Sequence, residues 1–169
     1  MRPALSRCVV QAAGLGLGLV LALPSWAGGT VQVEFKQPDR YTDIGFATVE
    51  RETNLKTLAG HMKRWEERLP DGQRLEIEVL DVDLAGEVRP WRALHEVRIL
   101  RGRIDWPRMN LRWALKAGDQ VLKSGDERIA DMAYLGTSAR LRYPEALAYD
   151  TRMLDDWLRT RVLAADVVR

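Results

Sequence analysis

The chain has 169 residues, with 26 basic and 24 acidic side chains and a formal net charge of +2. Two of the basic residues lie among the first 27, so the rest of the chain carries 24 basic residues against 24 acidic ones and is formally neutral. This balance gives no electrostatic reason to expect a nucleic acid or an anionic lipid surface as a partner. With 46% hydrophobic residues, the chain is long enough to bury one core without disulfides.

The first 27 residues have the order of a secretory signal peptide. Two arginines precede an apolar run, Val9–Leu23, and Ser25 and Ala27 supply the small residues that a signal peptidase recognises. We therefore expect residues 1–27 to be removed between Ala27 and Gly28, and the protein to be periplasmic or secreted. The apolar run is shorter than the about 20 residues of a membrane-spanning helix, so no membrane span is expected after cleavage.

A strand and a helix are predicted after this segment. Val31–Phe35 alternates apolar and polar residues, which is typical of a strand with one buried face. From Glu50 to Leu69, apolar residues recur every three or four positions, which predicts an amphipathic helix. Pro70-Asp71-Gly72 then ends the helix and turns the chain.

Arg74–Leu84 has the strongest strand pattern in the chain. Its apolar residues alternate with acidic ones, but the alternation slips by one residue between Val79 and Leu80. Without compensation, the slip would turn half of the apolar side chains to the wrong face, so we expect a β-bulge at this point. Ala85–His95, which contains a glycine and a proline, is predicted to form a loop.

Further strands and a second helix complete the pattern. Three segments are predicted strands, the last two joined as a hairpin: Glu96–Arg101, Met109–Lys116 and Val121–Ile129. Asp131–Tyr143 is not assigned, and an amphipathic helix follows Pro144 and runs to about Ala164. Residues 28–169 are thus predicted to form a single α+β domain. We expect an antiparallel sheet of about four to five strands, with both amphipathic helices packed on one face.

Four short phrases carry a resemblance to a known family. They are Tyr41–Asp43, Asp81–Gly86, Asp105–Arg108 and Tyr149–Trp157. Together they resemble the domain of unknown function 3016 family, a group of exported proteins of Gram-negative bacteria, over nearly the whole chain after residue 27. The second and fourth phrases are the most specific. This family has no established activity or catalytic residues, so the resemblance implies an exported single domain and leaves its function open.

Asp81 and Asp83 are the first candidates for chemistry. They lie two residues apart on a predicted strand, so both carboxylates point from one face, where they could share a hard cation with other oxygens. With Asp105 or Asp131 they could form the carboxylate pair of a hydrolase. Ion pairs with arginines, or solvation, are the other interpretation. The segment lacks the spaced oxygen ligands of a calcium loop, which weakens the metal hypothesis.

Other nucleophiles and metal ligands are poorly placed. His61 and His95 are far apart in the sequence and lack a third ligand, so a zinc site is not favoured. The only cysteine, Cys8, lies in the predicted signal peptide, so the mature chain would have neither a thiol nor a disulfide. Ser124 and Ser138 lie outside any Gly-x-Ser-x-Gly motif. We therefore assign no catalytic residue and expect no cofactor.

Two tryptophans beside arginines form a candidate binding face. Trp91 and Trp106 lie in or beside predicted loops, next to Arg92 and Arg108. Aromatic and guanidinium groups are enriched at protein interfaces, although the same pairs also stack on one another at the edge of a core. We expect a non-enzymatic periplasmic binding or envelope-accessory domain, with another envelope protein as its partner. A metal-dependent protein or hydrolase using the acidic strand face is the alternative, and the sequence does not indicate an oligomeric state.

Overall fold

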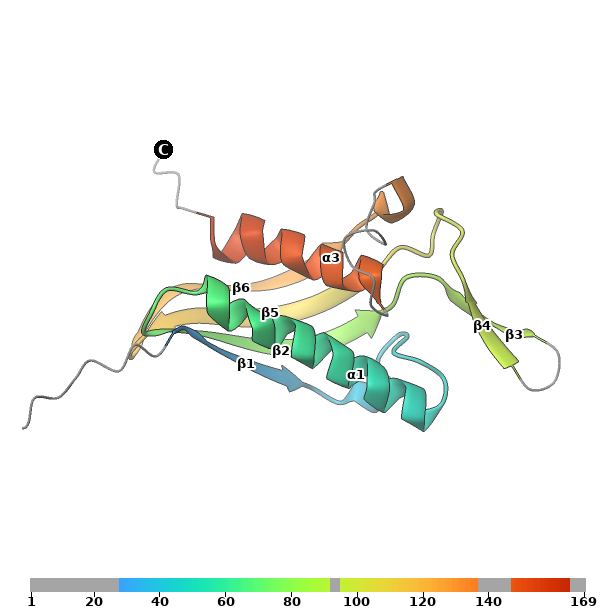
Figure 1. Cartoon of the computed structure of the whole chain (residues 1–169), viewed down its shortest axis with the longest axis horizontal. Helices are drawn as coiled ribbons and strands as arrows, with labels where there is room; N and C mark the ends of the chain where they lie inside the picture. Colours follow the sequence, from blue (N-terminus) through green and yellow to red (C-terminus); the bar gives the residue numbers. More distant parts are fainter. Residues whose placement is uncertain (1–27, 92–94, 137–146, 165–169) are drawn as a thin grey trace, which may run out of the picture.

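The computed structural model describes residues 28–91, 95–136 and 147–164, so the predicted signal peptide lies outside the described residues. Four strands form one sheet in the order β1-β2-β5-β6, and two form a separate hairpin, β3-β4 (Figure 1). The strands are β1 (Thr30–Phe35), β2 (Gln73–Asp83), β3 (Glu87–Trp91), β4 (His95–Ile99), β5 (Arg108–Ala117) and β6 (Gln120–Ala130). The two α-helices of the described chain are α1 (Thr48–Lys63) and α3 (Ala148–Trp157).

The position of α1 in the chain decides how β1 joins the sheet. β1 pairs with β2 in parallel, with Val31 opposite Leu75, because α1 carries the chain back across the sheet between the two strands. The pairs β2-β5 and β5-β6 are antiparallel. The α+β class is confirmed, and the sheet is antiparallel as expected except at β1, which makes it mixed.

The bulge predicted in the long strand is present. The pairing of β2 with β5 shifts register between Val79 and Asp81. As a result, Ile77 before the bulge and Val82 after it are both buried. The extra residue keeps the apolar side chains of both halves on the covered face of the sheet.

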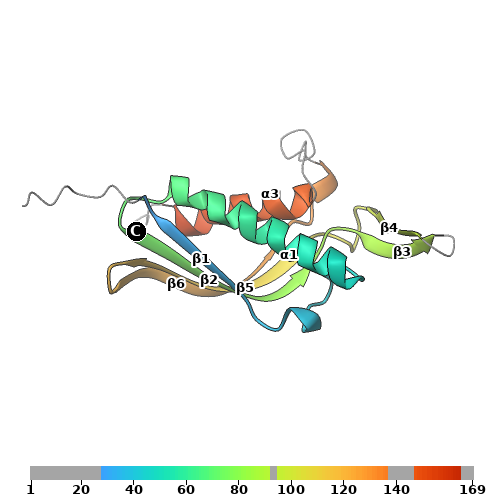
Figure 2. The same cartoon turned by 60° about the horizontal axis from the view of Figure 1, so that its bottom comes forward.

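The segment after β2 differs from the prediction. The sequence predicts a loop over Ala85–His95, but Glu87–Trp91 forms β3 and pairs with β4. Gly86, with φ of +90°, turns the chain at the end of β2, so the hairpin extends away from the main sheet (Figure 2). The apolar alternation in this hairpin is weak, which is why the sequence pattern failed to reveal β3.

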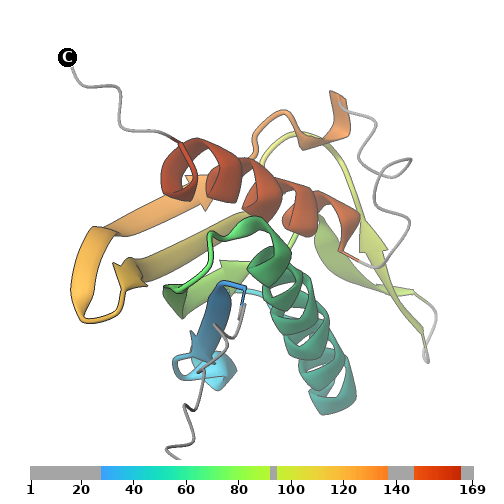
Figure 3. The ribbon, with the colours of Figure 1, turned by 60° about the vertical axis from the view of Figure 1, so that its left-hand side comes forward.

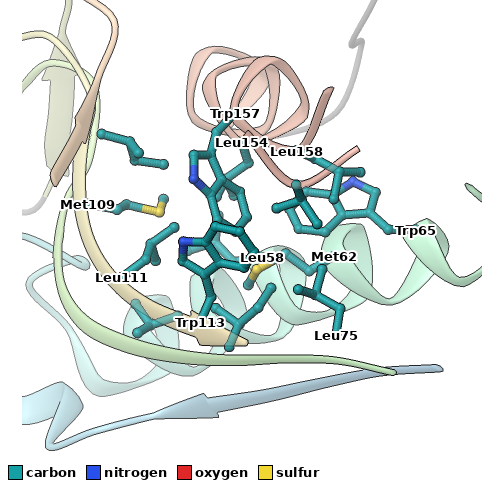
Figure 4. Packing of buried hydrophobic residues seen from close by; sticks show 14 of the residues in the cluster. Leu58, Met62, Trp65, Leu75, Met109, Leu111, Trp113, Leu154, Trp157 and Leu158 are labelled. Atoms are coloured by element: carbon teal, nitrogen blue, oxygen red, sulfur yellow. The ribbon is translucent and has the colours of Figure 1, made fainter. Parts of the chain in front are cut away.

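Both helices cover one face of the main sheet, as the sequence predicts (Figures 2 and 3). Three tryptophans join the two helices to the sheet in the core (Figure 4). The Trp157 ring lies 6.0 Å from the Trp65 ring and 5.7 Å from the Trp113 ring, measured between centroids, and meets the latter edge to face. Leu154 and Trp157, expected in the core from their helical spacing, are both buried.

The helix boundaries are shifted from those predicted. The helix expected to end at Leu69 continues beyond α1 as a 3-10 helix, Arg64–Arg68. The second helix starts at Ala148 and extends past Trp157 in a π-helical turn, Leu158–Val162. No helix in the described ranges is both long and apolar enough to cross a membrane.

Candidate functional site

Three of the phrases that carry the family resemblance, and the start of the fourth, meet at one end of the main sheet. Asp81–Gly86 forms the end of β2 and the turn after it, and Tyr41–Asp43 lies beside it. Asp105–Arg108 leads into β5, and Tyr149–Trp157 lies within α3. In Figure 1, the β3-β4 hairpin extends from the same end. We call these segments, together with the hairpin and the loops that contact them, the β2 end.

Asp43 joins the loop after β1 to both β2 and β4. Its N–H donates to the carbonyl of Val82 at 2.9 Å, and its carbonyl accepts from the N–H of Leu84 at 3.1 Å. Its carboxylate accepts two hydrogen bonds from the guanidinium of Arg98, at 2.8 and 3.1 Å. The side chains of Arg98 and Asp43 are only 21% and 24% exposed, so this pair is better shielded from water than a surface ion pair.

Arg98 also holds the turn between β2 and β3. The same guanidinium donates to the carbonyls of Ala85 and Gly86, at 3.4 and 3.3 Å. On the other side of this turn, the N–H of Ala85 donates to Oδ1 of Asp150 in α3, at 3.1 Å. One arginine of the hairpin and one carboxyl of α3 therefore hold the same turn in place.

Asp150 is the buried carboxyl group of the β2 end, with 2% of the residue exposed. Burial penalises its charged form and raises its pKa to about 7. The hydrogen bond from Ala85 and the charge of Arg98 oppose this rise, while the charge of Asp43 adds to it. The group therefore changes charge close to neutral pH.

Gly86 lies where a side chain would not fit. A Cβ atom there would lie 2.9 Å from the carbonyl oxygen of Ile99 and 2.7 Å from Cδ2 of Leu100, and φ is +90°. The N–H of Gly86 donates to the carbonyl of Asp105 at 2.8 Å, which fixes the turn against the segment leading into β5. Both the positive φ and the close approach favour glycine here.

The two metal candidates from the sequence are both engaged by neighbouring groups. Asp81 accepts hydrogen bonds from the N–H of Thr42 at 2.7 Å and from its hydroxyl at 2.9 Å. Asp83 accepts from Nε of Arg108 at 2.8 Å and from its terminal nitrogen. Within the part of the chain that the structure describes, no cluster of three or more His, Cys, Asp or Glu side chains is arranged to hold a metal ion.

The carboxylates considered for a hydrolase also have partners of their own. Asp105 accepts from the backbone N–H groups of Arg101 and Arg103. Burial opposes ionisation of Asp105, but these hydrogen bonds outweigh it and lower its pKa. Asp131 forms an ion pair with Arg152 of α3. Both carboxylates thus order the chain around them.

The two histidines have different settings. His61 is buried between Asp155, whose Oδ1 lies 3.1 Å from His61 Nε2, and Arg64, whose guanidinium lies 2.7 Å from His61 Nδ1. Asp155 also accepts a hydrogen bond from Trp65 Nε1 at 2.7 Å. This network joins α1 and the turn after it to α3. His95 belongs to β4, but its side chain lies outside the described part.

The predicted binding face is described only in part. Trp106 and Arg108 are in contact, with the guanidinium 5.7 Å from the ring centroid, and Arg108 also pairs with Asp83. Trp91 ends β3, but the structure does not describe its side chain, and Arg92 lies outside the described residues. The contact between Trp106 and Arg108 corresponds to the stacking alternative, and the binding face stays a prediction.

Exposed apolar side chains surround the β2 end. They are Phe46 (75% exposed), Val49 (74%), Ile104 (81%), Met132 (70%) and Leu135 (42%). They come from the start of α1 and the loop before it, the β4-β5 connection and the segment after β6, all of which lie toward the hairpin in Figure 1. A groove of about 340 Å³ runs along the loop after β1, where Tyr41, Ile44, Phe46 and Val88 contribute to its lining.

No pattern in the sequence predicted Asp43, Arg98 or Asp150 as site residues. Asp43 and Asp150 lie within the phrases that carry the family resemblance, so a signal was present for both. Arg98 lies in a short, ordinary strand, and no local feature of the sequence distinguishes it. Its role depends on Asp43, which is 55 residues away in the chain.

Comparison with known proteins places this chain in a family. A family model described as a protein of unknown function (DUF3016) matches residues 29–160. No curated protein and no solved structure matches the chain significantly. The matched range includes every segment of the β2 end, together with the six strands and two α-helices found in residues 28–91, 95–136 and 147–164. The chain therefore belongs to the DUF3016 family of proteins of unknown function.

Proposed function

We propose that the protein is a non-enzymatic binding domain of the bacterial envelope and that it binds another envelope protein through the β2 end. The exposed apolar side chains at this end carry the proposal, with Phe46 and Val49 in one segment and Ile104 and Met132 in two others. Several large apolar side chains exposed at one end of a domain are more than the single ones that are scattered over an ordinary surface, and such a concentration commonly marks a site of interaction. The ion pairs beneath these segments hold them in place, which reduces the entropy lost on binding.

The charged groups of the β2 end support binding rather than catalysis. Asp43, Asp81 and Asp83 each accept hydrogen bonds from donors of the protein itself. A general base needs a carboxylate within reach of a substrate proton, and these groups are occupied as structural acceptors. The groove beside them, of about 340 Å³, is near the lower limit of small-molecule pockets, about 300 Å³. It suits a few side chains of a protein partner better than a large cofactor.

Export is the second part of the proposal and rests on the order of segments in residues 1–27. Intact-mass measurement of the protein recovered from the periplasm tests it. The mass should correspond to a chain that begins at Gly28. A mass that retains Val9–Leu23 would mean an anchored protein and would contradict a periplasmic location.

Site-specific photo-crosslinking in the cells that produce the protein tests the binding surface. A photo-reactive residue at Phe46 or Ile104 should give a discrete adduct with one other envelope protein. The same group at Asp71, an exposed turn residue next to β2's start, should not give it. Val49→Asp should remove the Phe46 adduct while the melting temperature stays close to that of the parent, since Val49 is exposed. If Phe46, Ile104 and Asp71 give the same adducts, the β2 end is not the binding surface.

A further inference from the structure

A groove of about 300 Å³, which we call the β6-α3 groove, lies between β6 and α3. Residues 127–131 line one side, and residues between 153 and 161, in α3 and the π-helical turn after it, line the other. Two ion pairs join these sides at opposite ends, Arg152 with Asp131 and Arg161 with Glu127. The groove is as large as the smallest small-molecule pockets, and π-helical turns are frequent at functional sites.

Trp157 presents a buried hydrogen-bond donor to this groove. Only 4% of the residue is exposed, and Nε1 of its ring has no hydrogen-bond partner within the described ranges. In Figure 4, this nitrogen lies on the side of Met109, away from Trp65. Met109 pairs across the sheet with Ile129, which lines the groove together with Trp157. A buried N–H group without an acceptor costs free energy, so a molecule that accepts from it would stabilise the fold.

Glu127 supplies the complementary group, an acceptor. Its Oε1 accepts from Nε1 of Trp113 at 3.2 Å, whereas its Oε2 lies 3.6 Å from Nε of Arg161, beyond hydrogen-bond distance. The Glu127 side chain is only 25% exposed, so water reaches it less freely than a surface carboxylate. The groove therefore offers a ligand one donor, from Trp157, and one acceptor, from Glu127.

We propose that the β6-α3 groove binds a small neutral molecule through a primary amide group. The amide carbonyl accepts a hydrogen bond from Nε1 of Trp157, and the amide N–H donates to Oε2 of Glu127. An amide carries both functions, whereas an ammonium group has no acceptor for Trp157. This site does not depend on the function proposed for the β2 end.

The charges of the groove select against an anionic ligand. A carboxylate that accepts from Trp157 would share the groove with the charge of Glu127, and the other two lining carboxylates are already paired with arginines. The side chain of Arg161 is 67% exposed, so water screens its charge more than that of Glu127. Arg128 is next to Glu127 in the strand, so its side chain points to the opposite face of the sheet.

Three probes of equal size and similar shape test the site: benzamide, acetophenone and benzoate. The indole N–H signals of the isotope-labelled protein, expressed from residue 1 and purified as the cell processes it, report binding by nuclear magnetic resonance. Benzamide should move the Trp157 signal downfield to a saturating value. Acetophenone has the carbonyl but no N–H, so it should bind about 10-fold more weakly, as expected for one hydrogen bond to a charged group. Benzoate should bind no better than acetophenone.

Trp157→Phe identifies the indole signal of Trp157 and removes the donor. The methyl signal of Met153, which lines the groove, then measures binding, and benzamide should lose about 2- to 10-fold in affinity. If a water molecule alone serves the indole N–H, benzamide gives no saturable shift in the unmodified protein, and the proposal is overturned. Equal affinities for the three probes, or full affinity in Trp157→Phe, would overturn it as well.

Glu127→Gln and Asp126→Asn separate the groove from general effects of charge. Glu127→Gln keeps an oxygen acceptor for Trp113 but removes the charge, so the preference for benzamide over benzoate should shrink. Asp126→Asn removes the same charge from the adjacent residue, which pairs with Arg112 on the opposite face of the sheet, and should leave the preference unchanged. Equal effects of the two substitutions would contradict the assignment of Glu127.

Discussion

Arg98 of β4 holds Asp43, in the loop after β1, by two hydrogen bonds of 2.8 and 3.1 Å. The hairpin that contains Arg98 belongs to a separate two-stranded sheet, while Asp43 extends the main sheet beside β2. This ion pair therefore connects the two sheets. Since the same guanidinium also contacts the turn after β2, its removal should loosen several segments of the β2 end together.

Arg98→Ala should lower the free energy of unfolding by about 1.5 to 3 kcal/mol, the range for hydrogen bonds to charged groups. Arg98→Lys should restore little of this, because a lysine cannot donate two parallel hydrogen bonds to one carboxylate. Arg89→Ala, in the neighbouring strand, removes a surface pair with Glu87 and should cost less than about 0.5 kcal/mol. Urea denaturation measures all three. Equal losses of unfolding free energy for Arg98→Ala and Arg89→Ala would show that the ion pair between the sheets contributes little to stability.

Because of Asp150, the stability of the folded protein should fall as the pH rises toward neutral. Its pKa in the folded protein, about 7, is above its ordinary value of 3.8, so the folded state binds the proton more tightly than the unfolded state. The stabilisation from protonation is complete below about pH 4 and is lost as the pH rises to about 7. The contribution of Asp150 to the free energy of unfolding changes by at most about 1.4 kcal/mol per pH unit.

The Asp150→Asn variant should lack this pH-dependent contribution to stability, while its side-chain oxygen can still accept the hydrogen bond from the N–H of Ala85. Denaturant midpoints of the parent and the variant, measured between about pH 4 and pH 8, separate the contribution of Asp150 from that of other titrating groups. The parent should lose stability across this interval more steeply than the variant. Parallel curves would show that Asp150 is ionised throughout.

Asp155→Ala should cost about 3 to 5 kcal/mol of unfolding free energy, the range for breaking a buried charged pair. Oδ1 of Asp155 accepts from Trp65 Nε1 and contacts His61 Nε2, so the substitution removes the shared acceptor of a buried network. The adjacent Asp156 pairs with Arg159 in a more exposed position, and Asp156→Ala should cost less than about 1 kcal/mol. Similar denaturant midpoints for the two variants would contradict the buried position of Asp155 on α3.

Two buried tryptophans should respond differently to replacement by phenylalanine. Nε1 of Trp65 donates to Asp155 at 2.7 Å, whereas Nε1 of Trp157 is buried with no hydrogen-bond partner within the described ranges. Trp65→Phe should therefore destabilise the protein by about 1.5 to 3 kcal/mol more than Trp157→Phe, because it removes a hydrogen bond to a buried charged carboxylate, whereas Trp157→Phe removes none. Chemical denaturation of both variants measures the difference. The reverse order would mean that the indole of Trp157 makes a stabilising contact.

Calcium and magnesium should not raise the melting temperature. The two oxygens of Asp81 accept from Thr42, and Asp83 is paired with Arg108. A cation at one hundred times its dissociation constant would stabilise the fold by about 2.7 kcal/mol. Thermal melts with either cation or a chelator, at matched ionic strength, should coincide. A metal-dependent rise that disappears in Asp81→Asn would favour the metal-dependent alternative over a binding domain.

The sequence by itself determined the elements whose side chains follow a local period. The alternation in Arg74–Leu84 predicted both the strand and its bulge, because a slip in a two-residue period must be absorbed where it occurs. Helical spacing likewise placed Leu154 and Trp157 in the core. Such patterns record which face of an element is buried, and each can be recognised within about 10 to 20 neighbouring residues.

The tertiary structure alone decided which of these elements meet. The parallel pairing of β1, the β3-β4 hairpin and the contact of Arg98 with Asp43 all join segments through space, and no local period encodes them. The same holds for Asp150, whose raised pKa arises from burial among segments that are distant in the chain. Desolvation and long-range hydrogen bonds depend on which segments the fold brings together, so the β2 end could be recognised as one site only in three dimensions.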